Sequence, residues 1–222
     1  MAADYTLYCF AQSGNCFKAA LMLNLCGAKW TPRFVDFFNG ETRTSEYRAS
    51  INEMGEVPVL DDGARRLTQS GAILSHLAAK HGAYGGDSDD ERLEVLRWLL
   101  FDNHKFTSYF ASYRFMRAFG PAAPDTAVLG WLRGRLDNAF GIVDQHLADR
   151  AFLVGAGATI ADLSLSGYLF YPEAESGYEI VGRFPHIAAW LERLRQLPGW
   201  ANPYDVLPGA HIAPRWVSQA AG

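Results

Sequence analysis

Ser13 is the residue of this chain best placed to do chemistry. It follows an alternating, β-rich segment, Tyr5–Phe10, and precedes an apolar helical segment, Cys16–Leu25. A hydroxyl at such a helix start can donate a hydrogen bond to an anion, and the helix-end amides add positive potential. A thiol bound there would have its pKa lowered from about 8.5, so that more of it would be thiolate. Ser13, or Asn15 beside it, could equally be only a helix N-cap.

Val57-Pro58 is the second feature with a chemical consequence. Proline cannot donate a ladder hydrogen bond, so within a sheet it is confined to an edge, a strand start or a special turn. An X-Pro bond costs only about 0.5–1 kcal/mol to hold cis. A cis bond here would turn the backbone N–H and C=O of Val57 away from the sheet and toward a ligand. Beyond the strand that follows, Ser70 opens a helix.

The elements that must position these residues form a small mixed sheet covered by helices. The predicted order is β-α-β-α-β-β-α, the layout of a thioredoxin-like α/β domain. The predicted strands are Tyr5–Phe10, Trp30–Phe37, Val57–Leu60 and Ala64–Leu67, the last two joined by the hairpin signal Asp61-Asp62-Gly63. The predicted helices are Cys16–Leu25, a short or irregular one within Glu41–Ser50, and Gln69–His81.

Residues 82–90, rich in Gly and Asp, form the one convincing linker. Every segment after it has a helical period, which predicts an all-α helical bundle. The predicted helices are Glu91–Phe119, Thr126–Leu147, Thr159–Tyr171 and Phe184–Leu197. We therefore predict two domains, residues 1–82 and residues 88–222.

Thr159 and Asp162 form a local folding device. With Thr at the N-cap and a carboxylate at N3, each side chain can satisfy an orphan N–H of the first helical turn. Replacing Asp162 by alanine is predicted to cost about 1 kcal/mol. Asp162 is therefore not a candidate catalytic acid.

Composition and charge exclude several classes of protein. The chain has 222 residues, a formal net charge of −4 and no Lys/Arg-rich run, so nucleic acid and anionic membranes are poor candidate partners. No apolar run approaches the roughly 20 residues of a membrane span, and the first residues do not resemble a secretory signal. Three cysteines without Cys-x-x-Cys spacing disfavour a disulfide framework or a zinc site. We expect a cytoplasmic protein that uses neither metal nor nicotinamide.

His104 is a candidate for proton transfer. It shares one helix face with Arg97, Phe101 and Ser108, because the spacings are 4, 3 and 4 residues. That face could look into a cleft between the domains, where His104 could relay a proton. The alternative is a histidine that is solvated or lies in an interface.

Three motifs together resemble the glutathione transferase superfamily. The run Leu7–Lys18 is similar to the serine-type enzymes, and Gly55–Leu60 with Thr68–Leu74 is similar to the cis-proline loop and the following turn of that family. The Thr159-x-x-Asp162 box is similar to one in the family's C-terminal domain. The resemblance covers nearly the full chain and suggests bacterial theta-, zeta- or beta-like members.

The resemblance assigns roles in binding glutathione, which would be the co-substrate. Ser13 would contact the sulfur. Val57, before a cis Pro58, would pair its backbone with the cysteinyl unit. Gln69 and Ser70 would take the γ-glutamyl end, with its carboxylate at the N-terminus of the next helix.

Cys16 and Tyr8 are lower-ranked alternatives to Ser13. Cys16 falls where beta-class enzymes carry a cysteine that can form a mixed disulfide with glutathione, although a free cysteine in an apolar helix is usually a small buried hydrophobe. His104-Lys105 falls in register with a His-Lys pair near the sulfur site of the same class. Tyr8 ranks third, because its spacing to Gly14 differs from that of tyrosine-type enzymes.

Two residues depart from the family's pattern. Many relatives carry Glu where Gln69 stands, and an acid helps to bind the γ-glutamyl ammonium. That charge would then come from elsewhere, for example from Asp102 of the partner subunit. Glu56 stands where family members often have Lys or Gln before Val-Pro, so we expect weak binding of the glycine carboxylate and modest affinity for glutathione.

The expected function is that of a glutathione transferase, which conjugates the glutathione thiolate to small apolar electrophiles in detoxification. The resemblance also implies a homodimer. One alternative is a zeta-like isomerase of a maleyl dicarboxylate, with Arg97, Arg114 or Arg117 as carboxylate anchors. Another is a thiol transferase that depends on Cys16. A third is a non-catalytic binding module with the same fold.

Overall fold

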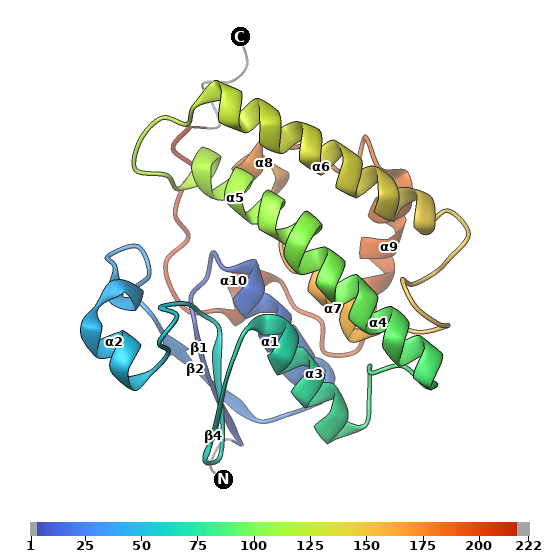
Figure 1. Cartoon of the computed structure of the whole chain (residues 1–222), viewed down its shortest axis with the longest axis horizontal. Helices are drawn as coiled ribbons and strands as arrows, with labels where there is room; N and C mark the ends of the chain where they lie inside the picture. The colour runs from blue at the N-terminus through green and yellow to red at the C-terminus, as the bar shows by residue number, and fades with distance from the viewer. Residues whose placement is uncertain (1–3, 217–222) are drawn as a thin grey trace.

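The computed structural model describes residues 4–216, and the first part of the molecule is built on a four-stranded mixed sheet (Figure 1). The strands are β1 (Tyr5–Cys9), β2 (Trp30–Phe34), β3 (Val59–Asp62) and β4 (Arg65–Thr68), in the spatial order β2-β1-β3-β4. β2 is parallel to β1, whereas β1–β3 and β3–β4 are antiparallel pairs. The helices of this part are α1 (Gly14–Leu25), the 3₁₀ turn η1 (Glu41–Arg43), α2 (Ser45–Ser50) and α3 (Ser70–His81). The predicted thioredoxin-like layout is confirmed.

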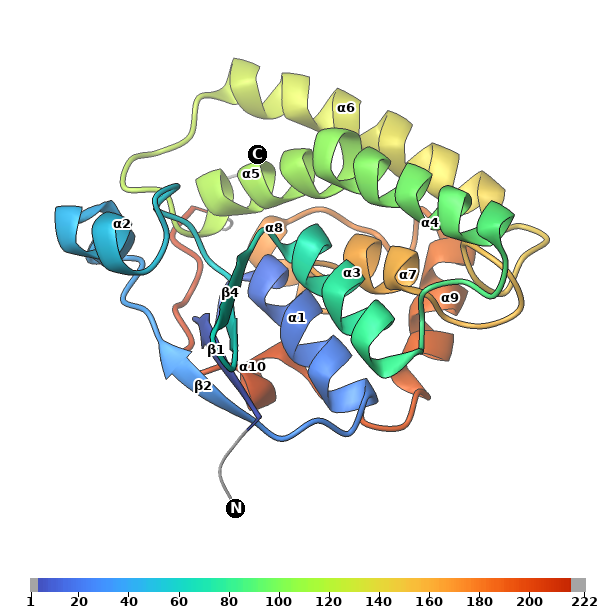
Figure 2. The same ribbon diagram turned by 60° about the horizontal axis from the view of Figure 1, so that its bottom comes forward.

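Alternation along the strands gives the sheet two apolar faces. Leu7 of β1 and Leu60 of β3 belong to the main core together with residues of α1 and α3. Their chain neighbours Tyr8 and Val59 point to the opposite face, where they pack with Tyr47 of α2. Figure 2 shows α1 and α3 side by side on one side of the sheet. β1 ends at Cys9, and the chain then enters the loop that carries Ser13 before α1 begins.

The second part is helical, as predicted. Its elements are α4 (Asp89–Phe101), the π-helical turn η2 (Asp102–Phe106), α5 (Thr107–Ala118), α6 (Thr126–His146), α7 (Ile160–Ser166), α8 (Glu173–Ser176), α9 (Pro185–Arg195) and α10 (Pro203–Val206). α4, η2 and α5 follow one another as one long helical segment, and α6 lies antiparallel beside this segment (Figure 1). One apolar core joins the two parts, because the main cluster contains residues from both.

The helix predicted over Thr159–Tyr171 ends five residues early, at Ser166. Gly167 and Pro172 explain the difference, since glycine is a poor helix former and proline cannot continue a helix. Gly167 also packs closely on α1, where an added Cβ would lie 2.5 Å from Cγ of Lys18. The chain therefore turns after α7.

Asp102 lies in the interior rather than at a subunit surface. Its side chain is fully buried, and its Oδ2 accepts hydrogen bonds from Nζ of Lys18 (2.7 Å) and from the hydroxyl of Ser164 (2.6 Å). Its Oδ1 accepts from the backbone N–H of Thr107 (3.2 Å), across the π-helical turn. The expectation that Asp102 reaches the glutathione of a partner subunit is wrong, because this carboxylate is used within its own chain to tie α1 to η2 and α7.

The capping box of α7 is present and extends further than predicted. The Asp162 carboxylate accepts from the backbone N–H of Thr159 (2.8 Å) and from its hydroxyl (3.0 Å). It also accepts from the Leu153 N–H (2.9 Å) and from Nε1 of Trp190 (2.9 Å), and it is fully buried. Asp162 therefore joins α7 to α9 as well as capping a helix.

Asp162→Ala is expected to lower the free energy of unfolding by about 3 kcal/mol rather than 1, because each buried donor left without a partner costs about 1–3 kcal/mol. Urea unfolding followed by circular dichroism measures the change. Asp125→Ala is the matched control, since the exposed Asp125 carboxylate caps only α6, through the N–H groups of Ala127 and Val128. Equal losses in the two variants would contradict the wider role of Asp162.

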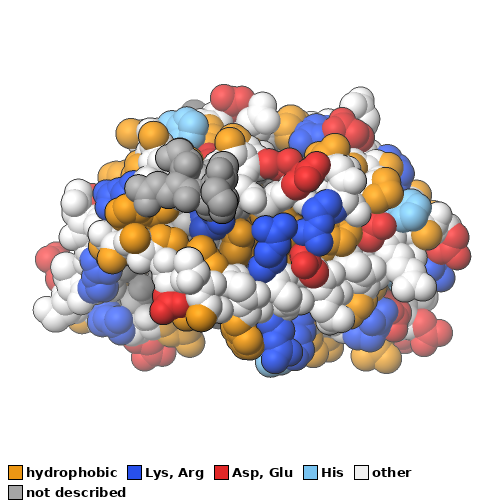
Figure 3. Space-filling view, turned by 90° about the horizontal axis from the view of Figure 1, so that it is seen from above, with side chains coloured by type: hydrophobic (Ala, Val, Ile, Leu, Met, Phe, Trp, Pro, Cys, Tyr) orange, Lys and Arg blue, Asp and Glu red, His pale blue; other side chains and the backbone are white. Residues whose placement is uncertain are grey.

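Surface charge and helix hydropathy give two further observations. Within residues 4–216, no helix combines the length and the apolar character needed to cross a membrane. On the face shown in Figure 3, Lys and Arg side chains are interspersed with Asp and Glu side chains.

Candidate active site

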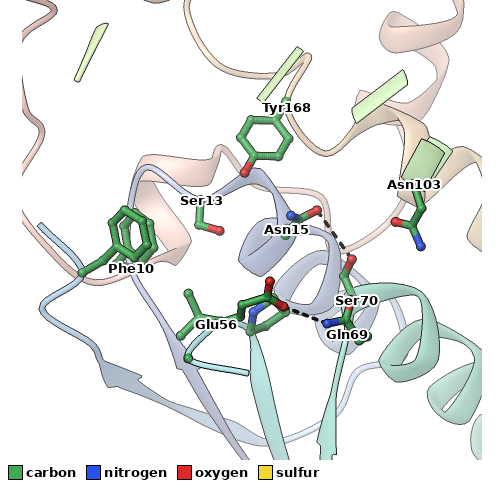
Figure 4. Close-up of a pocket in the computed structure, with 12 residues that line it drawn as sticks. Phe10, Ser13, Asn15, Glu56, Gln69, Ser70, Asn103 and Tyr168 are labelled. Carbon is green, nitrogen blue, oxygen red and sulfur yellow. Dashed lines mark hydrogen bonds between the residues drawn. The ribbon is translucent and has the colours of Figure 1, made fainter. Parts of the chain in front are cut away.

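A cavity of about 290 Å³ opens where the sheet, α1, α3 and the helical part meet (Figure 4). The β1–α1 loop and the start of α1 contribute Phe10, Ser13 and Asn15. Gly55–Pro58 forms a second wall, and Phe37, Gln69 and Ser70 complete the N-terminal side. Asn103 and Tyr168 reach it from the helical part. The cavity is therefore lined by both parts of the chain.

Five of the residues predicted from sequence line this one cavity: Ser13, Val57, Pro58, Gln69 and Ser70. The Val57–Pro58 peptide bond is cis. Cys16 and His104 are not among the lining residues. His104 is exposed on η2, and its chain neighbour Asn103 faces the cavity instead.

Ser13 can act both as a helix cap and as a hydrogen-bond donor. Its Oγ accepts a hydrogen bond from the backbone N–H of Cys16 (3.2 Å), so the cap expected from sequence is present. A serine hydroxyl has one proton to donate in addition to its acceptor positions. Since capping uses only an acceptor position, the O–H of Ser13 remains able to donate to an anion in the cavity.

The start of α3 forms the opposite side of the cavity. Gln69, its N-cap residue, has a φ of 66°, a left-handed value that is uncommon for a residue with a side chain. Its side-chain Nε2 donates to Oε2 of Glu56 (2.8 Å) and contacts Sδ of Met54 (3.2 Å). The Ser70 hydroxyl donates to Oδ1 of Asn15 at 3.5 Å, which links α3 to α1.

Tyr168 is a cavity residue that the sequence did not single out. It lies in the turn after α7, with its hydroxyl directed toward the Ser13 side of the cavity (Figure 4). Gly14 allows this approach, because an added Cβ would lie 2.3 Å from the Tyr168 ring. Burial raises the pKa of the Tyr168 hydroxyl, while the charge of Arg114 and the nearby Ser13 hydroxyl oppose that rise. Gly167 is the feature of the sequence that could have indicated this position, because it ends α7 just before Tyr168.

The loop that carries Ser13 is held by groups from the second half of the chain. The Tyr171 hydroxyl donates to the carbonyl of Ala11 (2.7 Å). Nη1 of Arg114 donates to the carbonyl of Gln12 (2.8 Å), and Nε2 of Gln12 donates to the carbonyl of Ala210 (2.6 Å). We call these three contacts the loop clamp. They hold the two residues that directly precede Ser13.

Three arginines considered as carboxylate anchors lie outside the cavity. Arg114 and Arg117 are buried, and Arg114 pairs with the buried carboxylate of Glu175. Arg97 pairs with Glu94 on the surface of α4 (2.6 Å). The described residues that line the cavity include no Lys, Arg or His.

Cys16 is buried in α1, and burial raises the pKa of its thiol to about 12, although hydrogen bonds from Ser13 and the backbone of Phe10 act in the opposite direction. Burial also raises the pKa of the Cys9 thiol. Cys26 is only partly buried. A thiol with a pKa of about 12 is almost entirely protonated at neutral pH, which does not favour a nucleophilic Cys16.

A thiol-specific disulfide reagent at pH 8 is therefore expected to modify Cys26 first, and Cys16 and Cys9 only after unfolding. The expected difference in rate is at least about 100-fold, because both burial and the small thiolate fraction slow the reaction. Mass spectrometry of digested samples identifies the modified residue, and Cys26→Ala serves as the control. Rapid modification of Cys16 in the folded protein would contradict this assignment.

Aromatic side chains form a wall beside Ser13. Phe10 stacks on Phe37 with ring centroids 4.7 Å apart and meets the edge of Phe38 at 5.7 Å. Phe37 and Phe38 in turn contact Phe115 and Phe119 at the end of the α5 segment (6.4 and 5.6 Å). This wall is apolar and adjoins the cavity at Phe10 and Phe37.

Comparisons with known proteins agree with this architecture. Residues 3–79 match the family model described as "Glutathione S-transferase, N-terminal domain", and residues 75–193 match "Glutathione S-transferase, C-terminal domain". A solved glutathione S-transferase from Xanthobacter autotrophicus Py2 is 32% identical, with a TM-score of 0.81 over 90% of this chain and 98% of that one. Ure2p in complex with glutathione is 25% identical, with a TM-score of 0.80 over 92% and 98%. The mouse protein glutathione S-transferase theta-2 is 30% identical over 78% of this chain and 73% of its own length.

Proposed function

Because this chain belongs to the glutathione S-transferase superfamily, we propose that it binds glutathione as a co-substrate and transfers it to small apolar electrophiles. One observation carries the proposal. The Ser13 hydroxyl, the cis Val57–Pro58 loop and the Gln69–Ser70 helix start line the same cavity. We take residues 1–82 as the glutathione-binding domain and residues 88–222 as the helical domain.

In the proposed complex each part of glutathione meets a different wall. The backbone of Val57 pairs with the cysteinyl unit as a short added strand. The N-terminal amides of α3 hold the γ-glutamyl carboxylate beside Gln69 and Ser70. The sulfur then lies near Ser13, whose hydroxyl donates to the thiolate and favours loss of the thiol proton to solvent.

The reaction is then a nucleophilic substitution or addition. The thiolate attacks an electrophilic carbon and a C–S bond forms. In a substitution the leaving group departs with its bonding electron pair. In an addition the π electron pair of the double bond moves to the conjugated acceptor group, which then takes a proton from solvent. The cavity aligns the two reactants, and Ser13 and Tyr168 stabilise the anionic sulfur before attack. The aromatic wall of Phe10 and Phe37 provides the apolar surface for the electrophile.

The rival functions draw less support from the geometry. The maleyl isomerase would need cationic anchors, and the arginines considered for that role lie outside the cavity. The thiol transferase would need an accessible thiolate at Cys16, which is buried. A non-catalytic binding module with the same cavity is an outcome that the experiment below distinguishes.

We further propose a cytoplasmic homodimer without nucleic-acid or membrane partners. Leu93, Leu96 and Leu100 of α4 are between about half and two-thirds exposed, which is a large apolar area for a helix surface. His104 follows them on η2 and is exposed, so we place it at this interface rather than in proton transfer. Sedimentation measures the mass in solution, and a monomer at micromolar concentration would contradict the dimer.

Calorimetric titration of glutathione, with ultraviolet difference absorbance to follow the thiolate, tests the proposed function. The expected result is saturable binding, a lowered pKa of the bound thiol and turnover of aromatic electrophiles. Saturable binding with no change in the thiol pKa and no turnover would favour the non-catalytic module. Absence of binding at millimolar glutathione would overturn the proposal.

A further inference from the structure

The γ-glutamyl end of glutathione carries two opposite charges, a carboxylate and an ammonium. Helix-start amides suit the carboxylate, but an ammonium needs an anionic or carbonyl acceptor. Of the described residues that line the cavity, Glu56 alone bears a carboxylate, and none bears a cation. The expected partner of the ammonium, an acid at position 69, is replaced here by the neutral Gln69.

Glu56 lies beside the position that lacks the acid. Its Oε2 accepts from Nε2 of Gln69 at 2.8 Å, and Figure 4 shows the two side chains meeting on the side of the cavity where Ser70 and Asn15 also meet. The carboxylate is thus next to the helix start that would hold the γ-glutamyl carboxylate.

The backbone of Glu56 is held in place. Its carbonyl accepts hydrogen bonds from the hydroxyl of Tyr47 (3.0 Å) and from Nδ2 of the buried Asn52 (2.9 Å). The following peptide begins the cis Val57–Pro58 loop. Since its carbonyl is held by two side chains, the Glu56 side chain extends from a defined point on the cavity rim.

We propose that Glu56 binds the α-ammonium of the γ-glutamyl unit and so does the work of the acid that many relatives carry at position 69. Gln69 orients this carboxylate through its Nε2, and its own amide oxygen is a second acceptor for the ammonium. The proposal rests on the proposed function. If Glu56 repelled the glycine carboxylate instead, removal of its charge would strengthen the binding of glutathione. Under the present proposal, removal of its charge weakens that binding.

Calorimetric dissociation constants for glutathione test the assignment. Glu56→Gln is expected to bind glutathione about tenfold more weakly than the unaltered protein, because a charge-assisted hydrogen bond is lost. Glu53→Gln removes the same charge three residues away, outside the cavity, and is expected to bind as the unaltered protein does. Moving the acid back, in Glu56→Gln combined with Gln69→Glu, is expected to restore most of the affinity.

A second ligand isolates the ammonium. For deaminated glutathione, which lacks the α-ammonium, Glu56→Gln is expected to change the affinity little. The assignment is overturned if Glu56→Gln tightens binding of glutathione, if it weakens both ligands equally, or if the exchanged pair fails to recover. Failure of the unaltered protein to bind glutathione is a separate result, which overturns the proposed function and this assignment with it.

Discussion

Ser13→Ala is expected to lower kcat/KM for conjugation of an aromatic electrophile by about 100-fold, the size of effect seen when one donor to a developing or bound anion is removed. The reason is that the Ser13 O–H is the proposed donor to the glutathione sulfur, while its oxygen already accepts the hydrogen bond that caps α1. Without this donor, the pKa of the bound thiol is expected to return toward its free value of about 8.5. The loss in rate should therefore become smaller as the pH rises above that value.

The pH profile of kcat/KM and the ultraviolet titration of bound glutathione measure this effect together. Ser112→Ala, which removes an exposed hydroxyl on α5 that does not line the cavity, is the matched control. Tyr168→Phe is expected to give a smaller loss, because Ser13 remains as a donor. An unchanged thiol pKa in Ser13→Ala would show that the residue acts only as a helix cap.

Lys18→Met is expected to lower the free energy of unfolding by about 3–5 kcal/mol, because it leaves the Asp102 carboxylate buried without its ion-pair partner. Both side chains are fully buried, and the pair joins α1 to the π-helical turn η2. Ser164 and Thr107 would still donate to the carboxylate, but neither carries a charge. Urea unfolding measures the loss.

Two comparison variants identify the cause. Arg97→Met breaks an exposed ion pair on α4 and is expected to cost about 0–1 kcal/mol. Adding Asp102→Asn to Lys18→Met removes the unpaired charge. The amide oxygen can still accept from the Thr107 N–H, and its NH2 group can donate to the Ser164 hydroxyl oxygen, so the double variant is expected to recover much of the stability. If the double variant is no more stable than Lys18→Met, the loss comes from packing rather than from an unpaired charge.

The parts of the fold that depend on local pattern could be predicted from sequence. Alternation over Tyr5–Phe10 predicted β1, and the structure packs Leu7 and Tyr8 on opposite faces of the sheet. The Val-Pro step indicated a loop at the edge of a cavity, and Ser13 was recognisable from its position between a strand and a helix. These signals lie within a few residues of the element they describe.

The parts that depend on distant contacts could not be predicted. The burial of Asp102 could not be foreseen, because it depends on an ion pair with Lys18, which lies 84 residues away in the chain. Tyr168 could not be singled out, because its segment has one continuous apolar pattern in the sequence. It faces Ser13 only because α7 ends at Ser166. The contact of Glu56 with Gln69 could not be predicted either, because it depends on how the cis-proline loop lies against α3.

The loop clamp has a consequence for synthesis of the protein. The first strands and α1 can pair as soon as they leave the ribosome. The carbonyls of Ala11 and Gln12, however, accept from Tyr171 and Arg114, and the Gln12 side chain donates to the carbonyl of Ala210. The backbone around Ser13 therefore reaches its final geometry only after nearly the whole chain has been translated. A nascent chain that has exposed only the sheet carries Ser13 without the backbone geometry of the finished cavity.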